Sequence, residues 1–241
     1  MTRAAFVWRQ GRLARTRTLT ASARSLTFDV PGWPGNDAGQ HVDVRLTAPD
    51  GYQAVRSYSV ASSGPGEQIE IAVERLPDGE VSPYLVDDLE LGDEAELRGP
   101  LGRWFVWQPG SVRPVQLIAG GSGVVPLVAM MRARANAHSA APMQLLYSLR
   151  SPDDALYRDE LTGPLATTVT TWHYTRAAPI DWPYRPKRLA ADDLRLKTLP
   201  PAREPLTYVC GPTGFVEAVA HILTELGHDP DSIRTERFGG N

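Results

Sequence analysis

The segment "LIAGGSGVVPL", Leu117–Leu127, runs an apolar strand directly into a glycine-rich turn and then into an apolar helical stretch. Glycines in such a turn let backbone amides approach a phosphate, and the following helix N-terminus adds partial positive charge. Two known motifs nearly fit and fail, because G-x-G-x-x-G needs glycine at Pro126 and G-x-S-x-G needs it at Val124. A plain tight turn is the alternative interpretation. The predicted phosphate contacts are Gly121, Ser122 and Gly123.

A second turn of this kind, "CGPTG" at Cys210–Gly214, lies between the strand "LTYVC" and the helical stretch "FVEAVAHILTEL". Ligands of open α/β sheets bind at the carboxyl ends of the parallel strands, so both turns are expected to face one crevice. We expect Cys210 to border that crevice together with Gly211 and Pro212. The alternative for Cys210 is a small buried apolar residue at a strand end.

The wider pattern changes character once along the chain. Before about Trp107, short β-rich segments alternate with turns, namely "SLTFDV", "HVDVRLTA", "RSYSVAS", "QIEIAVERL" and "EAELRG". From Val115 onward, buried strands alternate with helical stretches, which predicts a parallel sheet with crossover helices. The turn-forming segment "QPGSVRP", Gln108–Pro114, separates the two regimes. The predicted domains are residues 1–108, an antiparallel barrel or sandwich, and residues 109–241, an α/β domain.

Composition narrows the classes of function. The 241 residues carry a net charge of -3 without a basic run, so we expect no nucleic-acid partner. The lone Cys210 excludes an internal disulfide or a cluster held by four cysteines, so any one-electron centre must be organic or supplied by a partner. The five histidines lack metal-ligand spacing, and no metal site is expected. No apolar run reaches the roughly 18 residues of a membrane span, and no signal-peptide pattern opens the chain, which predicts a cytoplasmic protein without a membrane partner.

Two segments of the first domain carry anion-binding chemistry. In "RSYSVASS", Arg56–Ser63, strand alternation places Arg56 and Tyr58 on one face, and a guanidinium suits a diphosphate. The alternative is an edge strand with a solvated arginine. In "DGEVSPYL", Asp78–Leu85, glycine permits a tight turn, and Ser82 is predicted to cap a helix whose first turn holds a proline. That helix start is either an anion site or an ordinary cap.

Taken together, "RSYS", "GEVS", "GGSGVVP" and "CGPTG" occur in an order and at intervals that resemble the ferredoxin-NADP reductase superfamily. The resemblance is strongest to its bacterial two-domain flavin reductases lacking an iron-sulfur domain, and it covers nearly the whole chain. It implies a six-stranded antiparallel FAD-binding β-barrel followed by a parallel-sheet NAD(P)-binding domain. Flavin and nicotinamide would meet between the two domains.

The resemblance also implies roles for individual residues. Arg56 would pair with the flavin pyrophosphate, Tyr58 would stack on the isoalloxazine ring, and Ser59 would hydrogen-bond near flavin N5. The complete set implied for the flavin is Arg56, Ser57, Tyr58, Ser59, the backbone of Ile71 and Val73, and the phosphate turn of Gly79, Val81 and Ser82. Near the C-terminus, "RTERFGGN" offers Glu236 and Phe238 to approach the flavin. The residues expected next to the reacting atoms are Ser59, Cys210 and Glu236.

NADPH is predicted over NADH, because the second-strand position that binds a ribose hydroxyl in NADH-preferring folds holds Arg150, not an acid. Thr175 and Arg176, after the third strand, resemble the family's phosphate-binding serine-arginine pair, and Arg185 and Arg188 offer further cations. NADH is the alternative donor for two reasons. These arginines could be solvated surface charges, and the nearby Asp153 and Asp154 could reach a ribose.

The predicted function is a flavoprotein reductase that passes hydride from NADPH to FAD and electrons to a separate acceptor, a ferredoxin or flavodoxin. FAD is expected over FMN, because paired anion sites at Arg56 and Ser82 suit a diphosphate. The alternatives are a free-flavin or small-molecule reductase, a nitric-oxide-detoxifying reductase, and a non-catalytic redox sensor that binds both nucleotides.

Overall fold

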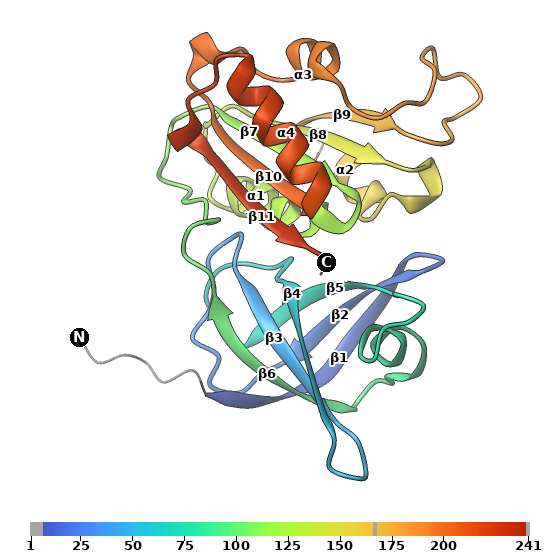
Figure 1. Ribbon diagram of the computed structural model, residues 1–241. Helices are drawn as coiled ribbons and strands as arrows, with labels where there is room; N and C mark the ends of the chain where they lie inside the picture. The colour runs from blue at the N-terminus through green and yellow to red at the C-terminus, as the bar shows by residue number, and fades with distance from the viewer. Residues whose placement is uncertain (1–6, 166–167, 240–241) are drawn as a thin grey trace. The chain divides into compact units, whose positions relative to one another are not determined.

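The computed structural model describes residues 7–165 and 168–239. These residues form two compact units that divide between Val106 and Trp107. Each unit is built on one sheet, antiparallel in the first unit and parallel in the second (Figure 1).

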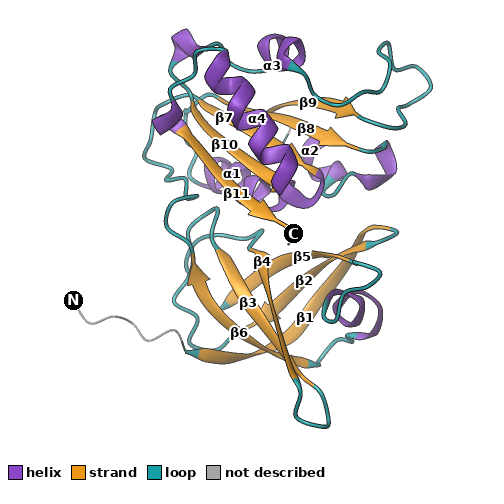
Figure 2. Ribbon diagram, in the orientation of Figure 1, coloured by secondary structure: helices purple, strands orange, loops and turns teal. Residues whose placement is uncertain are grey.

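The first unit is a six-stranded antiparallel sheet with the order β4-β3-β6-β1-β2-β5. The ribbon shows this sheet curving into a barrel (Figure 2). An isolated bridge from Val60 to Ile71 extends the pairing at the β5 edge. The predicted antiparallel barrel is therefore confirmed. Its strands are β1 (Trp8–Thr20), β2 (Ala23–Asp29), β3 (His41–Thr47), β4 (Gln53–Ser59), β5 (Gln68–Glu74) and β6 (Glu94–Leu101).

Strand β1 is the barrel strand that the sequence pattern did not reveal. Its segment "WRQGRLARTRTLT" buries Gly11 and Leu13, while its arginines and threonines stay at least partly exposed. It nevertheless pairs with β2 on one side and β6 on the other. A strand with so few buried apolar residues lacks the alternation that marks a half-buried strand in sequence.

The barrel core consists of fully buried aliphatic and aromatic side chains from opposing strands. Leu26, Phe28, Val44, Ile69 and Leu97 are all 0% exposed within one cluster. The short π-helical turn η1 (Tyr84–Asp88) adds the buried side chains of Leu85 and Val86 to this core.

Ser82 does not cap η1, so that sequence prediction is wrong. Pro83 occupies the N-cap position, and the turn has no side-chain capping bond. Instead, the Oγ atom of Ser82 accepts a hydrogen bond from the backbone N–H of Leu76 at 3.0 Å. The buried serine thus closes the 76–82 loop on itself.

The second unit is a five-stranded sheet with the order β11-β10-β7-β8-β9, and its strands pair in parallel. Figure 1 shows α4 in front of this sheet and α1 behind it. The predicted α/β domain is confirmed. Its strands are β7 (Val115–Gly120), β8 (Met143–Leu149), β9 (Val169–Tyr174), β10 (Leu206–Pro212) and β11 (Ile233–Phe238). Its helices are α1 (Val124–Asn136), α2 (Arg158–Thr162), α3 (Ala191–Lys197) and α4 (Thr213–Glu225), with short 3-10 turns η2 (Gly121–Gly123), η3 (Pro152–Asp154), η4 (Pro201–Arg203) and η5 (Pro230–Ser232).

Three elements of this unit differ from the sequence prediction. The sequence pattern predicts no strand after "LTYVC" and no helix before it at residues 191–197, whereas the structure has β11 and α3 there. The sequence pattern predicts a helix over the whole stretch "DALYRDEL", residues 154–161, but the α-helix spans only Arg158–Thr162. Both missed elements are rich in charged residues, and β11 lies at the sheet edge, so their apolar signal is weak.

Hydrophobic packing holds the helices against the sheet. Val216, Val219 and Leu223 of α4 pack with Ile118 of β7 and Val209 of β10. The first eight residues of α1, Val124 through Met131, are all buried. Among the residues that the structure describes, no helix is long and apolar enough to cross a membrane.

Candidate flavin and nucleotide sites

Strand β4 carries Arg56 and Tyr58 on the face that the strand alternation predicts. Their register partners on β3 are Val44 and Val42, which are completely buried in the barrel core. Tyr58 packs against that core. Burial raises the pKa of Tyr58 to about 12, so its phenol stays protonated.

Arg56 lies beside the "GEVS" turn. Its Nη2 atom is 2.6 Å from Oε2 of Glu80, and its Nη1 atom donates to the backbone oxygen of Val55 at 2.8 Å. The hydroxyl of Tyr52 donates to the other Glu80 oxygen at 3.0 Å. The structure therefore brings the two predicted anion-binding motifs together. The guanidinium of Arg56, which is expected to bind a flavin phosphate, is paired with the carboxylate of Glu80.

The turn at residues 79–82 is tightly built. A Cβ atom on Gly79 would lie 2.8 Å from the Oγ atom of Ser82, so a side chain there would disturb the loop. Val81 is 1% exposed and Ser82 is 5% exposed. Any phosphate contact of Val81 must therefore use its backbone.

Ser57 is turned to other partners. Its hydroxyl donates to Asp43 at 2.6 Å, and Asp43 also accepts from Arg98 at 2.6 Å. Burial acts to raise the pKa of Asp43, but the hydrogen bonds from Ser57 and Arg98 hold it below its ordinary value. Ser59, half-buried, ends β4 opposite His41.

The side chains of Ile71 and Val73 are fully buried in the barrel core. Only their backbone is therefore available to a ligand, which is the form of contact that the sequence interpretation assigned to them. Arg56 and the 79–82 turn fit an anionic group, since the arginine side chain is half-exposed and already ion-paired.

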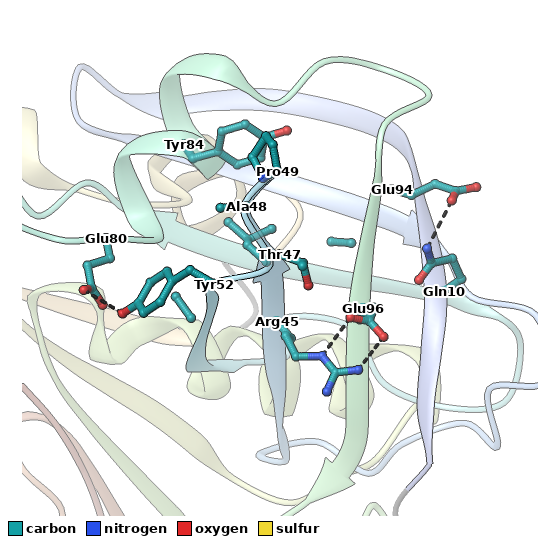
Figure 3. Close-up of a pocket in the computed structure, with 13 residues that line it drawn as sticks. Gln10, Arg45, Thr47, Ala48, Pro49, Tyr52, Glu80, Tyr84, Glu94 and Glu96 are labelled. Atoms are coloured by element: carbon teal, nitrogen blue, oxygen red, sulfur yellow. Dashed lines mark hydrogen bonds and ion pairs between the residues drawn. The ribbon is translucent and has the colours of Figure 1, made fainter.

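A cavity of about 640 Å³ adjoins this network in the first unit (Figure 3). Tyr52 and Glu80 contribute to its wall, whereas Arg56, Tyr58 and Ser59 do not line it. Farther along the wall, Arg45 donates to Glu96 at 2.7 Å and Gln10 donates to Glu94 at 3.2 Å. Sequence reasoning missed this cavity, because its wall draws on separate strands and on η1.

In the second unit, the glycine turn begins directly where β7 ends. Gly121 has a φ of +55°, a left-handed conformation that glycine adopts without strain. Gly123 approaches the end of β10 so closely that an added Cβ atom would lie 2.2 Å from the carbonyl oxygen of Cys210. The two predicted glycine turns therefore touch, with Ser122 half-buried between the glycines.

Cys210 and Glu236 are neighbours in register on β10 and β11. Cys210 is 0% exposed, which agrees with the alternative interpretation of a small buried residue. Burial, with a further contribution from the charge of Glu236, raises the pKa of the Cys210 thiol well above its ordinary value. This shift favours the neutral thiol.

The ends of these strands leave two candidate residues more accessible. Pro212, which follows Gly211, is exposed at the end of β10, and its register partner Phe238 is 37% exposed. Because the sequence interpretation missed β11, it did not foresee that Glu236 and Phe238 lie beside Cys210 and Pro212.

The predicted cations for the NADPH phosphate lie at the ends of adjacent strands. The N–H of Thr175 donates to the backbone oxygen of Leu149 at 2.8 Å, and the N–H of Arg176 donates to that of Arg150 at 2.9 Å. Both arginines are exposed. Of the competing acids, Asp154 accepts a hydrogen bond from the hydroxyl of Ser151 at 2.6 Å, and Asp153 is exposed.

A polar cluster that the sequence did not reveal anchors the segment after β9. The ring of buried His173 contacts the backbone oxygen of Lys187 and the Nζ atom of Lys197, each at 2.8 Å. Asp193 pairs with Lys187 at 2.9 Å and accepts from the N–H of Ala190 at 3.1 Å. The exposed Arg185 and Arg188 lie in the segment that this cluster holds.

Both units match known domain families. The family model described as the oxidoreductase FAD-binding domain matches residues 10–106, and the oxidoreductase NAD-binding domain matches residues 117–221. The chain is 28% identical to the toluate 1,2-dioxygenase electron transfer component of Pseudomonas putida, over 84% of this chain and 59% of that protein. It is 30% identical to a flavohemoprotein of Deinococcus radiodurans, over 96% of this chain and 60% of that protein. The chain thus spans about three fifths of the length of these curated relatives.

Solved structures share the fold. The FAD/NAD-binding domain of nitric oxide dioxygenase from Vibrio cholerae superimposes with a TM-score of 0.83 at 24% identity, covering 96% of this chain and 99% of that domain. The ferredoxin reductase of carbazole 1,9a-dioxygenase gives 0.81 at 25% identity, covering 97% of this chain and 70% of the other. The chain therefore carries an FAD-binding and an NAD-binding oxidoreductase domain in succession, which confirms the predicted resemblance to the ferredoxin-NADP reductase superfamily.

Proposed function

We propose that the protein is an NADPH-dependent flavoprotein reductase that passes electrons from bound FAD to a separate acceptor protein. One observation carries the proposal. In the unit that matches the FAD-binding family, the guanidinium of Arg56 lies against the 79–82 turn and pairs with the Glu80 carboxylate, and the same guanidinium suits a diphosphate.

FAD, when bound, would accept hydride from a nicotinamide and release the electrons onward. The chain's own residues would bind and orient the two nucleotides. Arg56 and the turn of Gly79, Val81 and Ser82 would hold the flavin diphosphate, Tyr58 would pack on the ring system, and Ser59 would donate toward its N5 atom. Ser57, Ile71 and Val73 complete the proposed flavin set.

In the second unit, the backbone of Gly121, Ser122 and Gly123 would approach the nicotinamide dinucleotide phosphates, with Gly211 and Pro212 on the neighbouring turn. Cys210 would act as a neutral, buried wall residue, because its thiol is protonated. Glu236 and Phe238 remain proposed neighbours of the flavin.

NADPH is the proposed donor because Arg150 and Arg176 are exposed at adjacent strand ends, where a 2′-phosphate needs cations. Thr175 would add a hydroxyl. NADH is the second candidate, since one relative at 28% identity is the NADH-cytochrome b5 reductase 1 of Coccidioides immitis.

The proposed acceptor is a ferredoxin or flavodoxin that serves an oxygenase. Relatives named as reductase or electron transfer components of propane 2-monooxygenase, glycine betaine monooxygenase and toluate dioxygenase support this choice. A nitric-oxide-detoxifying or small-molecule reductase is the second candidate, because flavohemoproteins are relatives of similar identity.

Two measurements test the proposal. Mass spectrometry of the flavin released from purified protein should find FAD, whereas FMN alone would contradict the diphosphate assignment. Stopped-flow mixing with NADPH should then bleach the yellow flavin. A flavin that stays oxidised with both NADPH and NADH would instead favour the non-catalytic sensor.

Steady-state turnover should next be compared across ferredoxins, flavodoxins, cytochrome, ferricyanide and oxygen. We expect the fastest turnover with a ferredoxin or flavodoxin from the same organism. Reduction of ferricyanide without turnover of any carrier protein would favour the small-molecule reductase.

A further inference from the structure

Glu80 occupies an unexpected position within the "GEVS" turn. Its carboxylate bridges Arg56, at 2.6 Å, and the hydroxyl of Tyr52, at 3.0 Å. Figure 3 shows Tyr52 and Glu80 facing each other at the wall of the cavity. The residue that the flavin diphosphate is expected to contact is therefore engaged by a carboxylate of the chain itself.

The Arg56–Glu80 pair is exposed enough to be exchanged. The arginine side chain is 50% exposed and that of the glutamate 51%. Ion pairs in that environment contribute little to stability, because water screens the charges and the side chains lose rotamer freedom. A diphosphate offers several oxygens to the same guanidinium and forms stronger charge-assisted bonds. Diphosphate binding at Arg56 would therefore displace the carboxylate.

Tyr52 keeps the displaced carboxylate near the site. Its hydroxyl holds the second Glu80 oxygen, and this hydrogen bond raises the pKa of the Tyr52 phenol, which therefore remains a donor. After Arg56 turns to a diphosphate, a negative charge would still stand next to the bound anion. Competition for Arg56 and like-charge repulsion from Glu80 would therefore both weaken the binding of a diphosphate.

We propose that Glu80 weakens flavin binding by competing with the flavin diphosphate for Arg56, so that this residue sets the FAD affinity of the protein. The inference rests on the proposed binding of FAD at Arg56. It predicts that neutralising Glu80 tightens FAD binding, which is the opposite of the effect expected for a residue that holds the cofactor.

The test is fluorescence titration of the flavin-free full-length protein with FAD, comparing wild type with Glu80→Gln. Glutamine keeps the size of the side chain but removes the charge, and we expect the dissociation constant to fall about two- to tenfold. Tyr52→Phe should also lower the dissociation constant, but by less, because the displaced Glu80 carboxylate is then no longer held next to the bound diphosphate. Glu94→Gln is the matched control, since this exposed glutamate lines the same cavity and bonds Gln10.

Riboflavin, which carries no phosphate, separates competition at Arg56 from a general effect on the barrel. Its dissociation constant should be unchanged by Glu80→Gln. Unchanged or weaker FAD binding by Glu80→Gln would overturn the inference, as would equal tightening for riboflavin or an equal effect of Glu94→Gln. Failure of the wild-type protein to bind FAD at all would instead reject the proposed function, so the two failures are distinguishable.

Discussion

At the scale of single residues, Arg176 offers a direct test of nucleotide choice. Its backbone is tied to Arg150, while its side chain is exposed at the end of β9. Replacing Arg176 by alanine should raise the Michaelis constant for NADPH by losing a charge-assisted bond, which contributes about 1.5–3 kcal/mol. Steady-state kinetics with NADH should stay nearly unchanged.

Arg203→Ala is the matched control for this prediction. Arg203 is also an exposed arginine, but it precedes β10 and so lies toward the amino ends of the parallel strands. Its removal should affect neither nucleotide. An equal rise in the Michaelis constants for NADPH and NADH in Arg176→Ala would contradict the assignment of the 2′-phosphate site. A wild-type protein that turns over faster with NADH would contradict it as well.

At the scale of elements, the contact between the β7–α1 turn and the end of β10 depends on Gly123. A methyl group at this position would lie 2.2 Å from the carbonyl oxygen and 2.4 Å from the carbonyl carbon of Cys210, which are backbone atoms. Gly123→Ala should therefore force the two turns apart. Chemical denaturation should show a loss of about 1–3 kcal/mol in the free energy of unfolding, as for other overpacked sites.

Gly214→Ala serves as the comparison for Gly123→Ala. Gly214 lies in the first turn of α4, and an added Cβ atom would meet nothing within 4 Å. Alanine in an open helical position should leave stability unchanged or raise it by up to about 1 kcal/mol. Equal destabilisation by both substitutions would show that the turn-to-turn contact is not the cause.

The cluster around His173 makes the segment after β9 sensitive to acid. Burial lowers the pKa of His173 below its ordinary value of 6.5, and the positive charge of the neighbouring Lys197 acts in the same direction. Lys187 and Asp193 are the other charged residues around the ring. Below pH 6.5 the unfolded chain therefore binds a proton that the folded protein resists. Stability from this residue is present above pH 6.5 and is lost as the pH falls.

Denaturation curves between pH 7.5 and about pH 5 check this prediction. The free energy of unfolding of His173→Gln should fall less steeply with acid than that of the wild type. His221→Gln is the control, because the His221 side chain is 73% exposed. An acid dependence in His173→Gln identical to that of the wild type would contradict the role of His173.

At the scale of the whole molecule, two units with separate cores predict two separate patterns of ligand protection. FAD binding should slow amide hydrogen exchange most strongly in β4 and in the 79–82 turn. NADP⁺ binding should slow exchange most strongly in the β7–α1 turn and at the ends of β8 and β9. Bound ligand suppresses local opening in proportion to its saturation. Strongest protection by FAD at the β7–α1 turn would contradict the proposed flavin site.

The sequence by itself determined the architecture and most of the motif placement. Two of the signals are local: the apolar alternation in "QIEIAVE" and the strand-turn-helix pattern of "LIAGGSGVVPL". Each can be recognised from residues close together in the sequence, because the burial of one strand face or of a whole strand requires apolar residues at regular, closely spaced positions. The shared face of Arg56 and Tyr58 followed from the two-residue period of a strand.

Only the tertiary structure decided the features that depend on partners far along the chain. Strand β1 buries only Gly11 and Leu13, and β11 lies at a sheet edge, so neither carries a strong apolar pattern. Both form because neighbouring strands satisfy the hydrogen bonds of their backbone. The Arg56–Glu80 pair and the register of Cys210 with Glu236 join residues separated in sequence. Such pairs arise from strand register and loop path, which depend on the packing of the whole unit.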